Sequence, residues 1–583
     1  MTDRQQVASI LDEIARHLEL EEGGQFRARA YANAARVVGS LEVPIETFIR
    51  SGEIDRTPGI GKAIGAVIRE VAERGSSSTL EGLRASTPPA MFEMMRLPGL
   101  GARKAAQIQR ELGIGSIAEL EAAARSGRIR ALRGFGKRAE EKILQSIEMA
   151  ARTGDRILLS AALRFAESLC ERIAALEGVD AVEIAGSVRR RLETVEGVDL
   201  CVASADPDAA LARIGELGML AEPRRGEPGE LIARGERELK VRVRACEPGE
   251  LPTTLLAETG SPEFVGALGE AAASRGLRLD PRGLWKGRTR LRAAREHDVF
   301  RHVGIPFVEP ELRETAEYVS RRRPPRRLVA PESLRGVFHV HTTWSDGRAT
   351  LREMLDAARE RGLEYVGISD HSRSAYYARG LDLDRLDLQQ REIESSRKAS
   401  GPMKILKGTE ADILADGAID YGDEVLGRFD FVVASVHSRF GMGRDEMTER
   451  IVRAIENPFV TFLGHPTGRL LLSREGYQLD FDRVFDAAAE NGVVIEINGN
   501  PRRLDLDWRL MRGAIDRGVM LSINPDAHST GELDHVAFGC FDARKGAVEP
   551  KHVLNARPVD EVVAYLAARR RRAIRRVGRP ARA

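Results

Sequence analysis

The chain has 583 residues, which is more than one hydrophobic core normally supports, so we expect several domains. Hydrophobic residues make up 42% and charged residues 31%, and 90 basic residues nearly balance 88 acidic ones to leave a net charge of +2, as in ordinary globular proteins. No apolar run approaches the roughly 20 residues that span a bilayer, and the four cysteines form no CxxC pair, so the sequence indicates neither a membrane protein nor a disulfide scaffold and predicts a cytoplasmic location.

A Gly-apolar-Gly turn occurs three times in the first 150 residues, each time before a helical pattern. Such a turn lets a phosphate approach the backbone and aims the free N–H groups of the next helix at it. One turn alone would be interpreted as a plain helix-helix connection, but three, followed by basic residues such as Lys104, indicate binding to the DNA backbone. The turns resemble helix-hairpin-helix motifs, and they predict an α-helical DNA-binding domain at residues 1–85 and a fingers-like domain at residues 86–150. The paired glycines are Gly59 and Gly61, Gly99 and Gly101, and Gly134 and Gly136.

A strand pattern at residues 181–185 leads into Gly-Ser-Val-Arg-Arg at residues 186–190. With this motif, residues 151–248 resemble the α/β nucleotidyltransferase palm of family X DNA polymerases. The resemblance implies that Ser187 and Arg190 bind the phosphates of a nucleotide. It also implies that three aspartates on two neighbouring strands should hold two magnesium ions.

The three family aspartates are not all present in this sequence. Gly197 stands in place of the first and Arg242 in place of the third, which leaves Asp199. A positive charge at residue 242 opposes cation binding, so we expect magnesium binding in the palm and DNA synthesis to be lost. Two alternatives remain open: a shifted register could let Glu196 replace the first aspartate, and Glu247 could reach the site from beyond the second strand.

Two further segments complete the first half of the chain and the connection to the second. Residues 305–314 resemble the end of the family's thumb, which we place at residues 249–318. Residues 321–327 combine adjacent prolines with repelling charges and indicate a basic linker at residues 319–333. A second basic stretch, residues 571–583, is either a phosphate-binding tail or a solvated end.

After the linker, short apolar runs alternate with helical patterns. Seven such runs lie between residues 337 and 523, and the helical pattern that starts at Leu351 places its apolar residues on one face. Alternating strand and helix patterns imply a parallel sheet, and about seven repeats imply a closed or nearly closed barrel. We therefore expect a distorted (β/α)7 barrel at residues 334–570.

Histidines and carboxylates follow six of the seven predicted strands. His339 and His341 are two residues apart, so both face one side, and the other groups also arrive at the C-terminal ends of strands. A lone histidine at a strand end is usually a hydrogen-bonded structural residue. Here nine potential ligands occur together, which is more than one ion accepts. We predict two or three divalent ions bridged by Glu410, with manganese favoured and zinc or iron as alternatives. The predicted ligands are His339, His341, Asp346, His371, Glu410, His437, His465, Asp526 and His528.

The motifs around these ligands closely resemble the PHP (polymerase and histidinol phosphatase) domain. They include His-Val-His at residues 339–341, Ser-Asp-His at 369–371, Gly-Thr-Glu at 408–410 and Asn-Pro-Asp-Ala-His at 524–528. The resemblance implies a phosphoesterase with a trinuclear site, and the residues that we assign to catalysis are Glu410, His341, Asp346 and Asp526. Three arginines near the ligand loops either bind substrate phosphates or form structural salt bridges: Arg373, Arg439 and Arg503.

The combined layout resembles bacterial family X polymerases with a C-terminal PHP domain. It implies a metal-dependent 3′→5′ exonuclease in DNA repair, such as base excision repair, with AP endonuclease or 3′-end phosphatase as further activities. We expect a monomer that acts on gapped, nicked, recessed or abasic DNA at the nucleoid. Two other functions stay open: an active gap-filling polymerase with proofreading, and a non-catalytic DNA-binding scaffold that holds no metal. A metabolic phosphatase is disfavoured, because the three DNA-binding turns would then have no purpose.

Overall fold

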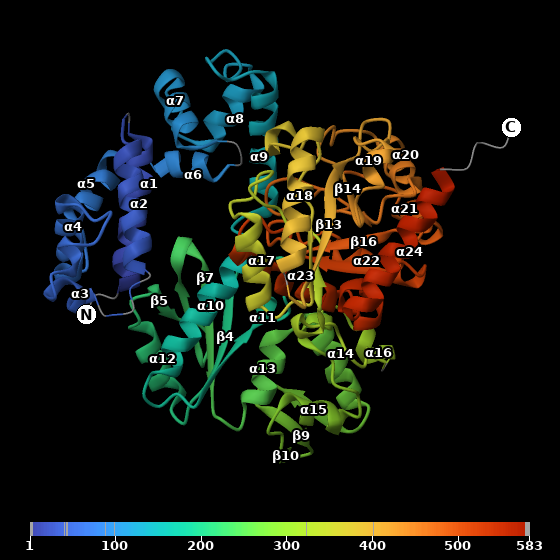
Figure 1. The fold of residues 1–583 in the computed structure, drawn as a ribbon. Helices are drawn as coiled ribbons and strands as arrows, with labels where there is room; N and C mark the ends of the chain where they lie inside the picture. Colours follow the sequence, from blue (N-terminus) through green and yellow to red (C-terminus); the bar gives the residue numbers. More distant parts are fainter. Residues whose placement is uncertain are drawn as a thin grey trace. The chain divides into compact units, whose positions relative to one another are not determined.

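The computed structural model describes residues 4–21, 23–39, 41, 43, 45–87, 89–97, 100–321, 323–399 and 401–577. The chain divides into two compact units, Met1–Gly154 and Asp155–Ala583 (Figure 1). The described part of the first unit is helical, as predicted. Its elements are α1 (Arg4–Leu20), α2 (Gln25–Gly39), α3 (Ile45–Arg50), η1 (Glu53–Asp55), α4 (Lys62–Arg74), α5 (Ser78–Ser86), α6 (Pro89–Arg96), α7 (Ala102–Leu112), α8 (Ile117–Arg125) and α9 (Lys137–Thr153).

Two hydrophobic clusters form the core of the first unit. Helix α4 contributes Ile64, Val67, Ile68 and Val71 to one of them, and this spacing places the four side chains on one helical face. The second cluster lies among α6, α7, α8 and α9. The helices therefore form because each has an apolar face to bury, and the turns between them stay at the surface.

The second unit begins with a five-stranded sheet of order β2-β4-β7-β6-β5, in which β4 and β7 are parallel and the other neighbours antiparallel. Val198 and Leu200 of β4 pack into the core below the sheet. Because alternate residues of a strand face opposite sides, Asp199 lies on the other face, paired in register with Arg242. The elements are β1 (Ile157–Leu158), α10 (Leu159–Ala174), β2 (Ala181–Ala185), α11 (Gly186–Arg189), β3 (Thr194–Val195), β4 (Gly197–Ala203), α12 (Pro207–Gly215), β5 (Ala221–Arg225), β6 (Glu230–Arg234), η2 (Glu236–Glu238) and β7 (Lys240–Cys246).

The segment that follows combines helices with a small antiparallel sheet of order β10-β9-β8. Its core contains a fully buried arginine, Arg313, whose guanidinium donates to Glu296 at 2.8 Å. Arg189 binds the other oxygen of Glu296 at 2.6 Å and joins this segment to the sheet before it. The elements are α13 (Leu251–Thr259), α14 (Pro262–Ala273), β8 (Leu277–Asp280), β9 (Gly283–Lys286), β10 (Thr289–Leu291), α15 (Glu296–Val303), η3 (Pro310–Leu312), α16 (Glu317–Arg321) and η4 (Pro331–Ser333).

The Glu296 ion pair predicts an acid-sensitive contribution to stability. Burial acts to raise the pKa of Glu296, but Arg189 and Arg313 outweigh it and lower that pKa from 4.5 to about 2. A carboxyl with a depressed folded-state pKa stabilises the fold above the unfolded value of 4.5, and this stability is lost as the pH falls from there towards 2. We expect Glu296→Gln to cost about 3 kcal/mol at pH 7, because it leaves a buried arginine without its full partner.

Thermal melting at pH 7, 5 and 4 measures this effect. The difference in melting temperature between wild type and Glu296→Gln should become smaller as the pH falls. Glu270→Gln, at an exposed position of α14, is the control and should leave the melting temperature unchanged. An equal difference in melting temperature at every pH would contradict the lowered pKa of Glu296.

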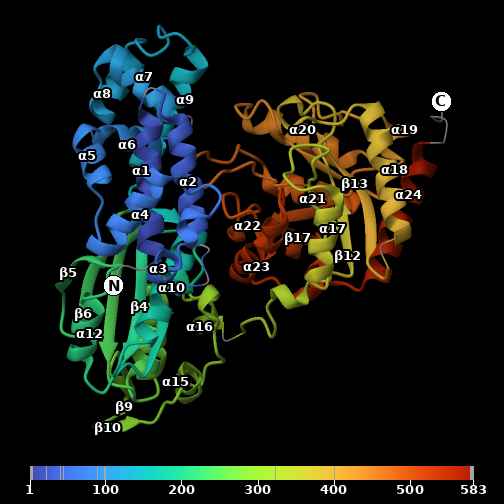
Figure 2. The same ribbon diagram turned by 60° about the vertical axis from the view of Figure 1, so that its left-hand side comes forward.

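Seven parallel strands in sequence order, β11 to β17, form the barrel. A parallel bridge between Val340 and Ala527 extends β11 and β17, so the sheet nearly closes. The ring of Phe338 contacts the rings of Phe431 and Phe462 from strands across the barrel, at centroid distances of 5.4 and 4.7 Å, and these aromatics fill the interior. Figure 2 shows helices such as α17 and α18 outside the strands. The fold class predicted from the sequence is therefore confirmed.

The barrel's elements are β11 (Gly336–Val337), α17 (Leu351–Glu360), β12 (Tyr365–Ile368), η5 (Tyr376–Ala378), α18 (Leu383–Ala399), β13 (Lys404–Asp412), α19 (Asp423–Leu426), β14 (Phe431–Ser435), α20 (Arg444–Glu456), β15 (Phe462–Leu463), α21 (Phe481–Asn491), β16 (Val494–Asn498), α22 (Trp508–Asp516), β17 (Leu521–Asn524), η6 (Thr530–His535), α23 (Val536–Lys545), η7 (Pro550–His552), η8 (Leu554–Ala556) and α24 (Val559–Val577). Among the described residues, none of the helices is both long and apolar enough to span a bilayer.

Within the second unit, the barrel contacts the preceding domains through a buried lysine. The ammonium of Lys545 donates to Glu314 at 2.8 Å and to the carbonyl of Arg190 at 3.1 Å, and it lies 4.7 Å from the centre of the Trp508 ring. The side chain of Lys545 is fully buried. The contact therefore joins α23 of the barrel to the turn after β2.

Several expected domain boundaries fall inside helices. Residues 85, 150, 318 and 570 lie within α5, α9, α16 and α24. The expected linker includes part of α16 and also Val329, which is fully buried and donates its N–H to Val548. The helical hydrogen bonding continues through these four positions. The end of the expected basic tail, residues 578–583, lies outside the described residues.

Candidate metal centre

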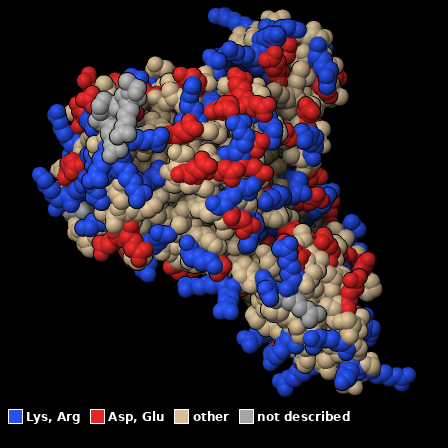
Figure 3. All heavy atoms as spheres, turned by 90° about the vertical axis from the view of Figure 1, so that its right-hand side faces the viewer, with Lys and Arg blue, Asp and Glu red and all other residues tan. Residues whose placement is uncertain are grey.

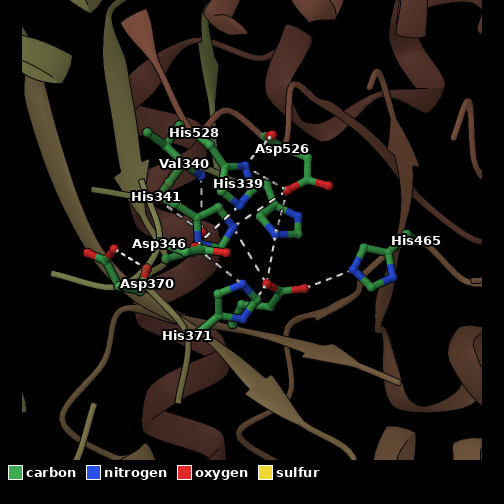
Figure 4. Close-up of polar contacts among 12 residues, drawn as sticks. His339, Val340, His341, Asp346, Asp370, His371, His465, Asp526 and His528 are labelled. Atoms are coloured by element: carbon green, nitrogen blue, oxygen red, sulfur yellow. Dashed lines mark hydrogen bonds and ion pairs between the residues drawn. The ribbon is translucent and has the colours of Figure 1, made fainter. Parts of the chain in front are cut away.

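The predicted ligands meet at the C-terminal end of the barrel (Figure 4). His339 and His341 flank Val340, the residue that bridges to Ala527, so their side chains leave the backbone on the same side. His371 forms a parallel bridge with Glu410 of β13. The remaining histidines follow β14, β15 and β17, so the parallel strands deliver every group to one edge.

Glu410 lies at the centre of this arrangement and is 1% exposed. Its Oε1 lies 2.9 Å from Nε2 of His465 and 3.2 Å from Nε2 of His437. Its Oε2 lies 3.0 Å from Nδ1 of His371, 3.3 Å from Nε2 of His339 and 3.5 Å from Nε2 of His341. One carboxylate thus faces five imidazoles with its two oxygens, as a bridging ligand would.

Two aspartates complete the cluster. Asp346 Oδ1 lies 3.4 Å from Nε2 of His528 and 3.6 Å from Nε2 of His371. Asp526 Oδ1 lies 3.5 Å from Nε2 of His341. Three groups with ligand atoms close enough for one ion can be formed among the described residues: His341, Asp346, His371 and His528; His339, His341 and Asp526; and His371, Glu410 and His437.

The electrostatics of the cluster favour cations. Burial acts to raise the pKa of Glu410, but His371 and His339 in particular outweigh it and hold that pKa well below its usual range. Burial also acts to raise the pKa of Asp346, yet His528 and its neighbours lower it to about 2. Both carboxylates are therefore ionised at neutral pH. This is the charge state that binds a metal.

Buried ligand atoms without hydrogen bonds support the same conclusion. Nδ1 and Nε2 of His341 and Oδ1 of Asp346 are buried, yet they make no hydrogen bond within the part of the chain that the structure describes. Such groups are costly unless another partner satisfies them, and a divalent cation would do so. The donor set of imidazoles and carboxylates suits the metals expected from the sequence. Asp346 and His528 are also the most exposed of the nine side chains, at 32% and 26%, so the centre opens on their side.

Sequence reasoning missed two carboxylates that orient the ligands. Nδ1–H of His339 donates to Glu496 of β16 at 2.7 Å, and Nδ1–H of His437 donates to Asp412 of β13 at 2.7 Å. Each bond fixes the tautomer and leaves Nε2 facing the cluster. The signal for Glu496 was an acidic residue inside the apolar run Val-Val-Ile-Glu-Ile, where a solvated side chain is not expected.

Removing the Glu496 charge should weaken metal binding without unfolding the barrel. Outer partners of this kind typically contribute about 10–100-fold to metal affinity, so we expect Glu496→Gln to raise the dissociation constant by that factor. Titration of manganese into metal-free protein by calorimetry measures it. Glu490→Gln, at an exposed position of α21, is the matched control. Equal affinities for both variants would show that Glu496 does not support the ligands.

The three arginines expected near the substrate differ in their positions. Arg503 is 18% exposed, and its Nε lies 3.4 Å from Oδ2 of Asp526, beside the cluster. Arg373 and Arg439 are exposed on the loops that follow β12 and β14. Arg503 is therefore the arginine that the fold places against a predicted ligand.

The palm holds an ion-pair network where the family's metal site would lie. Arg242 Nε donates to Oδ1 of Asp199 at 2.8 Å, and Arg242 also contacts Glu258 at 3.0 Å. The pair lines a cleft of about 570 Å³ that Ser187 also lines. Arg190 does not line that cleft; its guanidinium pairs with Glu314 at 3.1 Å.

The alternatives for the missing palm aspartates find no support in the geometry. Glu196 also lines the cleft, but its side chain is 65% exposed and pairs with Arg156 at 3.2 Å, rather than with Asp199. Glu247 follows the end of β7 and is exposed. In contrast, the guanidinium of Arg242 already neutralises the remaining aspartate.

The glycine turns lie at the start of α4, α7 and α9, as expected. Gly61, Gly101 and Gly136 are the N-caps of these helices, and none of the three makes a side-chain cap, so the first N–H groups are available. Gly59 and Gly134 adopt positive φ values of 90° and 84°, which favour glycine. A Cβ at any of these five would meet no atom within 4 Å, so the turns are open.

Two further residues of the predicted DNA-binding set are Gly99 and Lys104. Gly99 lies outside the described residues. Lys104 is exposed at the start of α7, and its ammonium lies 5.7 Å from the centre of the Phe135 ring.

Comparison with known proteins matches three families in chain order. They are the helix-hairpin-helix domain over residues 2–77, the DNA polymerase beta thumb over residues 254–314 and the PHP domain over residues 338–500. A DNA polymerase/3′-5′ exonuclease PolX from Bacillus subtilis is 34% identical over 97% of this chain and 99% of its own length. A probable phosphatase from Caldanaerobacter subterraneus is 30% identical over 41% of this chain and 94% of its own. A solved Leishmania infantum polymerase beta covers 39% of this chain and 100% of its own, with 24% identity and a TM-score of 0.26.

Proposed function

Because the chain belongs to the PolX family, we propose that its barrel is a metal-dependent 3′→5′ exonuclease that trims DNA ends, and that its palm no longer synthesises DNA. The observation that carries the proposal is the position of Glu410, with both oxygens facing the imidazoles of the cluster. A buried carboxylate in that position, with unsatisfied ligand nitrogens around it, is suited to bridge two or three divalent ions. We favour manganese, with zinc or iron as alternatives.

The chain's own residues would prepare the centre for phosphodiester hydrolysis. When bound, the ions would supply an activated water and stabilise the leaving 3′-oxygen. The C-terminal ends of the parallel strands position five of the histidines: His339, His341, His371, His437 and His465. Arg503 lies beside Asp526 and is placed to bind a phosphate oxygen of the substrate. AP endonuclease and 3′-end phosphatase activities need the same centre and are included in the proposal.

DNA would be held mainly by local contacts rather than by overall charge. On the face that Figure 3 shows, basic and acidic side chains are interspersed, in keeping with the near balance of 90 and 88. The three helix N-termini behind glycine turns bind phosphates through N–H groups without regard to sequence. We propose that they hold gapped, nicked, recessed or abasic DNA, with the protein acting as a monomer at the nucleoid.

Digestion of end-labelled DNA with and without added manganese tests the proposal. We expect shortening from the 3′ end that depends on the metal and stops after treatment with a chelator. A non-catalytic scaffold would leave the labelled strand intact and would carry no metal in elemental analysis.

A further inference from the structure

Two neighbouring tyrosines are exposed beside the metal centre. Tyr376 is 88% exposed and Tyr377 is 68% exposed, in the short helix η5 that follows His371. The ring of Tyr377 lies 6.1 Å, centre to centre, from the ring of His371 and 6.1 Å from that of His437. Large aromatic side chains are normally buried, so an exposed pair at this position suggests a bound partner.

The loop that carries the tyrosines is firmly held. Leu381 donates its N–H to the carbonyl of His371 at 2.9 Å, which closes the loop at its base. Ala375 and Ala378 are fully buried beneath the tyrosines. Gly380 allows this packing, because a Cβ there would lie 1.9 Å from the carbonyl oxygen of Ser372. The alanines thus anchor the loop while the tyrosines face outwards in a fixed place.

The position of the pair suits a nucleobase. Successive bases of a strand are about 3.4 Å apart along the helix axis. The Tyr377 ring lies 6.1 Å from the rings of His371 and His437, which is within two such steps of these predicted ligands. Arg503 beside Asp526 and the exposed Arg373 and Arg439 supply positive charge for the backbone of the same strand. An aromatic surface together with basic side chains is the combination that binds single-stranded nucleic acid.

We propose that Tyr376 and Tyr377 form a stacking platform for unpaired nucleobases next to the phosphodiester that is cleaved. The inference rests on the proposed function, because it assumes a DNA strand in the metal centre. Only bases released from a duplex can stack in this way, so the platform selects an unpaired 3′ end. The tyrosines act by positioning the strand and take no part in the chemical step.

Oligonucleotides that lack terminal bases test the platform. One 5′-labelled single strand carries normal bases, and a second carries two abasic nucleotides at its 3′ end. Base stacking on aromatic residues contributes about 1–3 kcal/mol per base, so Tyr376→Ala/Tyr377→Ala should raise KM on the normal strand roughly tenfold or more, with little change in kcat. Tyr376→Phe/Tyr377→Phe should stay within about twofold of wild type, because phenylalanine also stacks. On the abasic strand, wild type and both double variants should have the same KM.

Binding measurements separate this inference from the proposed function. Fluorescence anisotropy with a strand protected by 3′-phosphorothioate linkages reports stacking without cleavage, and Leu388→Ala, at a 51% exposed position of α18, is the control. If the normal strand binds through the tyrosines but unprotected DNA is not cleaved, the platform stands and the exonuclease proposal fails. If cleavage and binding are the same for wild type and the alanine variant, the platform is overturned and the exonuclease stands.

Discussion

Replacing Glu410 with alanine is expected to reduce the rate of DNA hydrolysis by at least about a thousandfold, because the metal centre would no longer activate water. The side chain contacts five of the predicted histidine ligands, so its loss removes the carboxylate that we propose as the bridge between the ions. We also expect the bound metal to fall, because neutral imidazoles and two aspartates hold fewer cations than the complete cluster.

The measurement is manganese-dependent digestion of 5′-labelled DNA, with metal content determined by elemental analysis. Glu360→Ala, at an exposed position near the end of α17, keeps the same change in charge away from the centre and should digest DNA like wild type. If Glu410→Ala degrades DNA as fast as its parent, the barrel cluster is not the active centre.

The second large effect is the expected absence of templated nucleotide addition. Two magnesium ions need several carboxylate oxygens, whereas here Arg242 binds the one remaining aspartate, Asp199, at 2.8 Å. Glu258 binds the same guanidinium at 3.0 Å, so the arginine is held in place from two sides. We expect no primer extension with either magnesium or manganese.

Primer extension should be measured in the Glu410→Ala background, so that hydrolysis does not remove the product, with an active family X polymerase as positive control. Restoring the lost aspartates with Gly197→Asp/Arg242→Asp should also fail. A Cβ at Gly197 would lie 2.6 Å from the backbone oxygen of Lys240 on the adjacent strand, so the new side chain cannot enter without moving that strand. Any extension by the Glu410→Ala protein would show that the palm is an active polymerase.

The barrel and its cluster could be predicted from the sequence because their signals are local. The predicted ligands lie on the apolar runs or in the loops after them, and parallel strands bring their C-terminal ends together whatever the loops between them do. Glu496 and Asp412 also lie on strands, but their roles depend on which histidine of another strand faces them. A single sequence does not specify such cross-strand pairs, so these partners became visible only in the folded chain.

The palm also contains an interaction that the sequence alone did not predict. The sequence predicted that Gly197 and Arg242 stand in place of two carboxylates, because these positions follow recognisable motifs. It did not reveal that Glu258, from helix α13, supplies a second partner to Arg242. Domain boundaries were also placed imperfectly, because charge changes along the chain do not coincide with the ends of helices such as α16 and α24.

The buried ammonium of Lys545 ties the barrel to the domains that precede it. Both of its acceptors, Glu314 and the carbonyl of Arg190, belong to the domains before the linker, so a barrel cut free at residue 333 would lose both partners and expose the buried surface around Lys545 to solvent. A palm that we propose to be unable to synthesise DNA would therefore still support the barrel structurally.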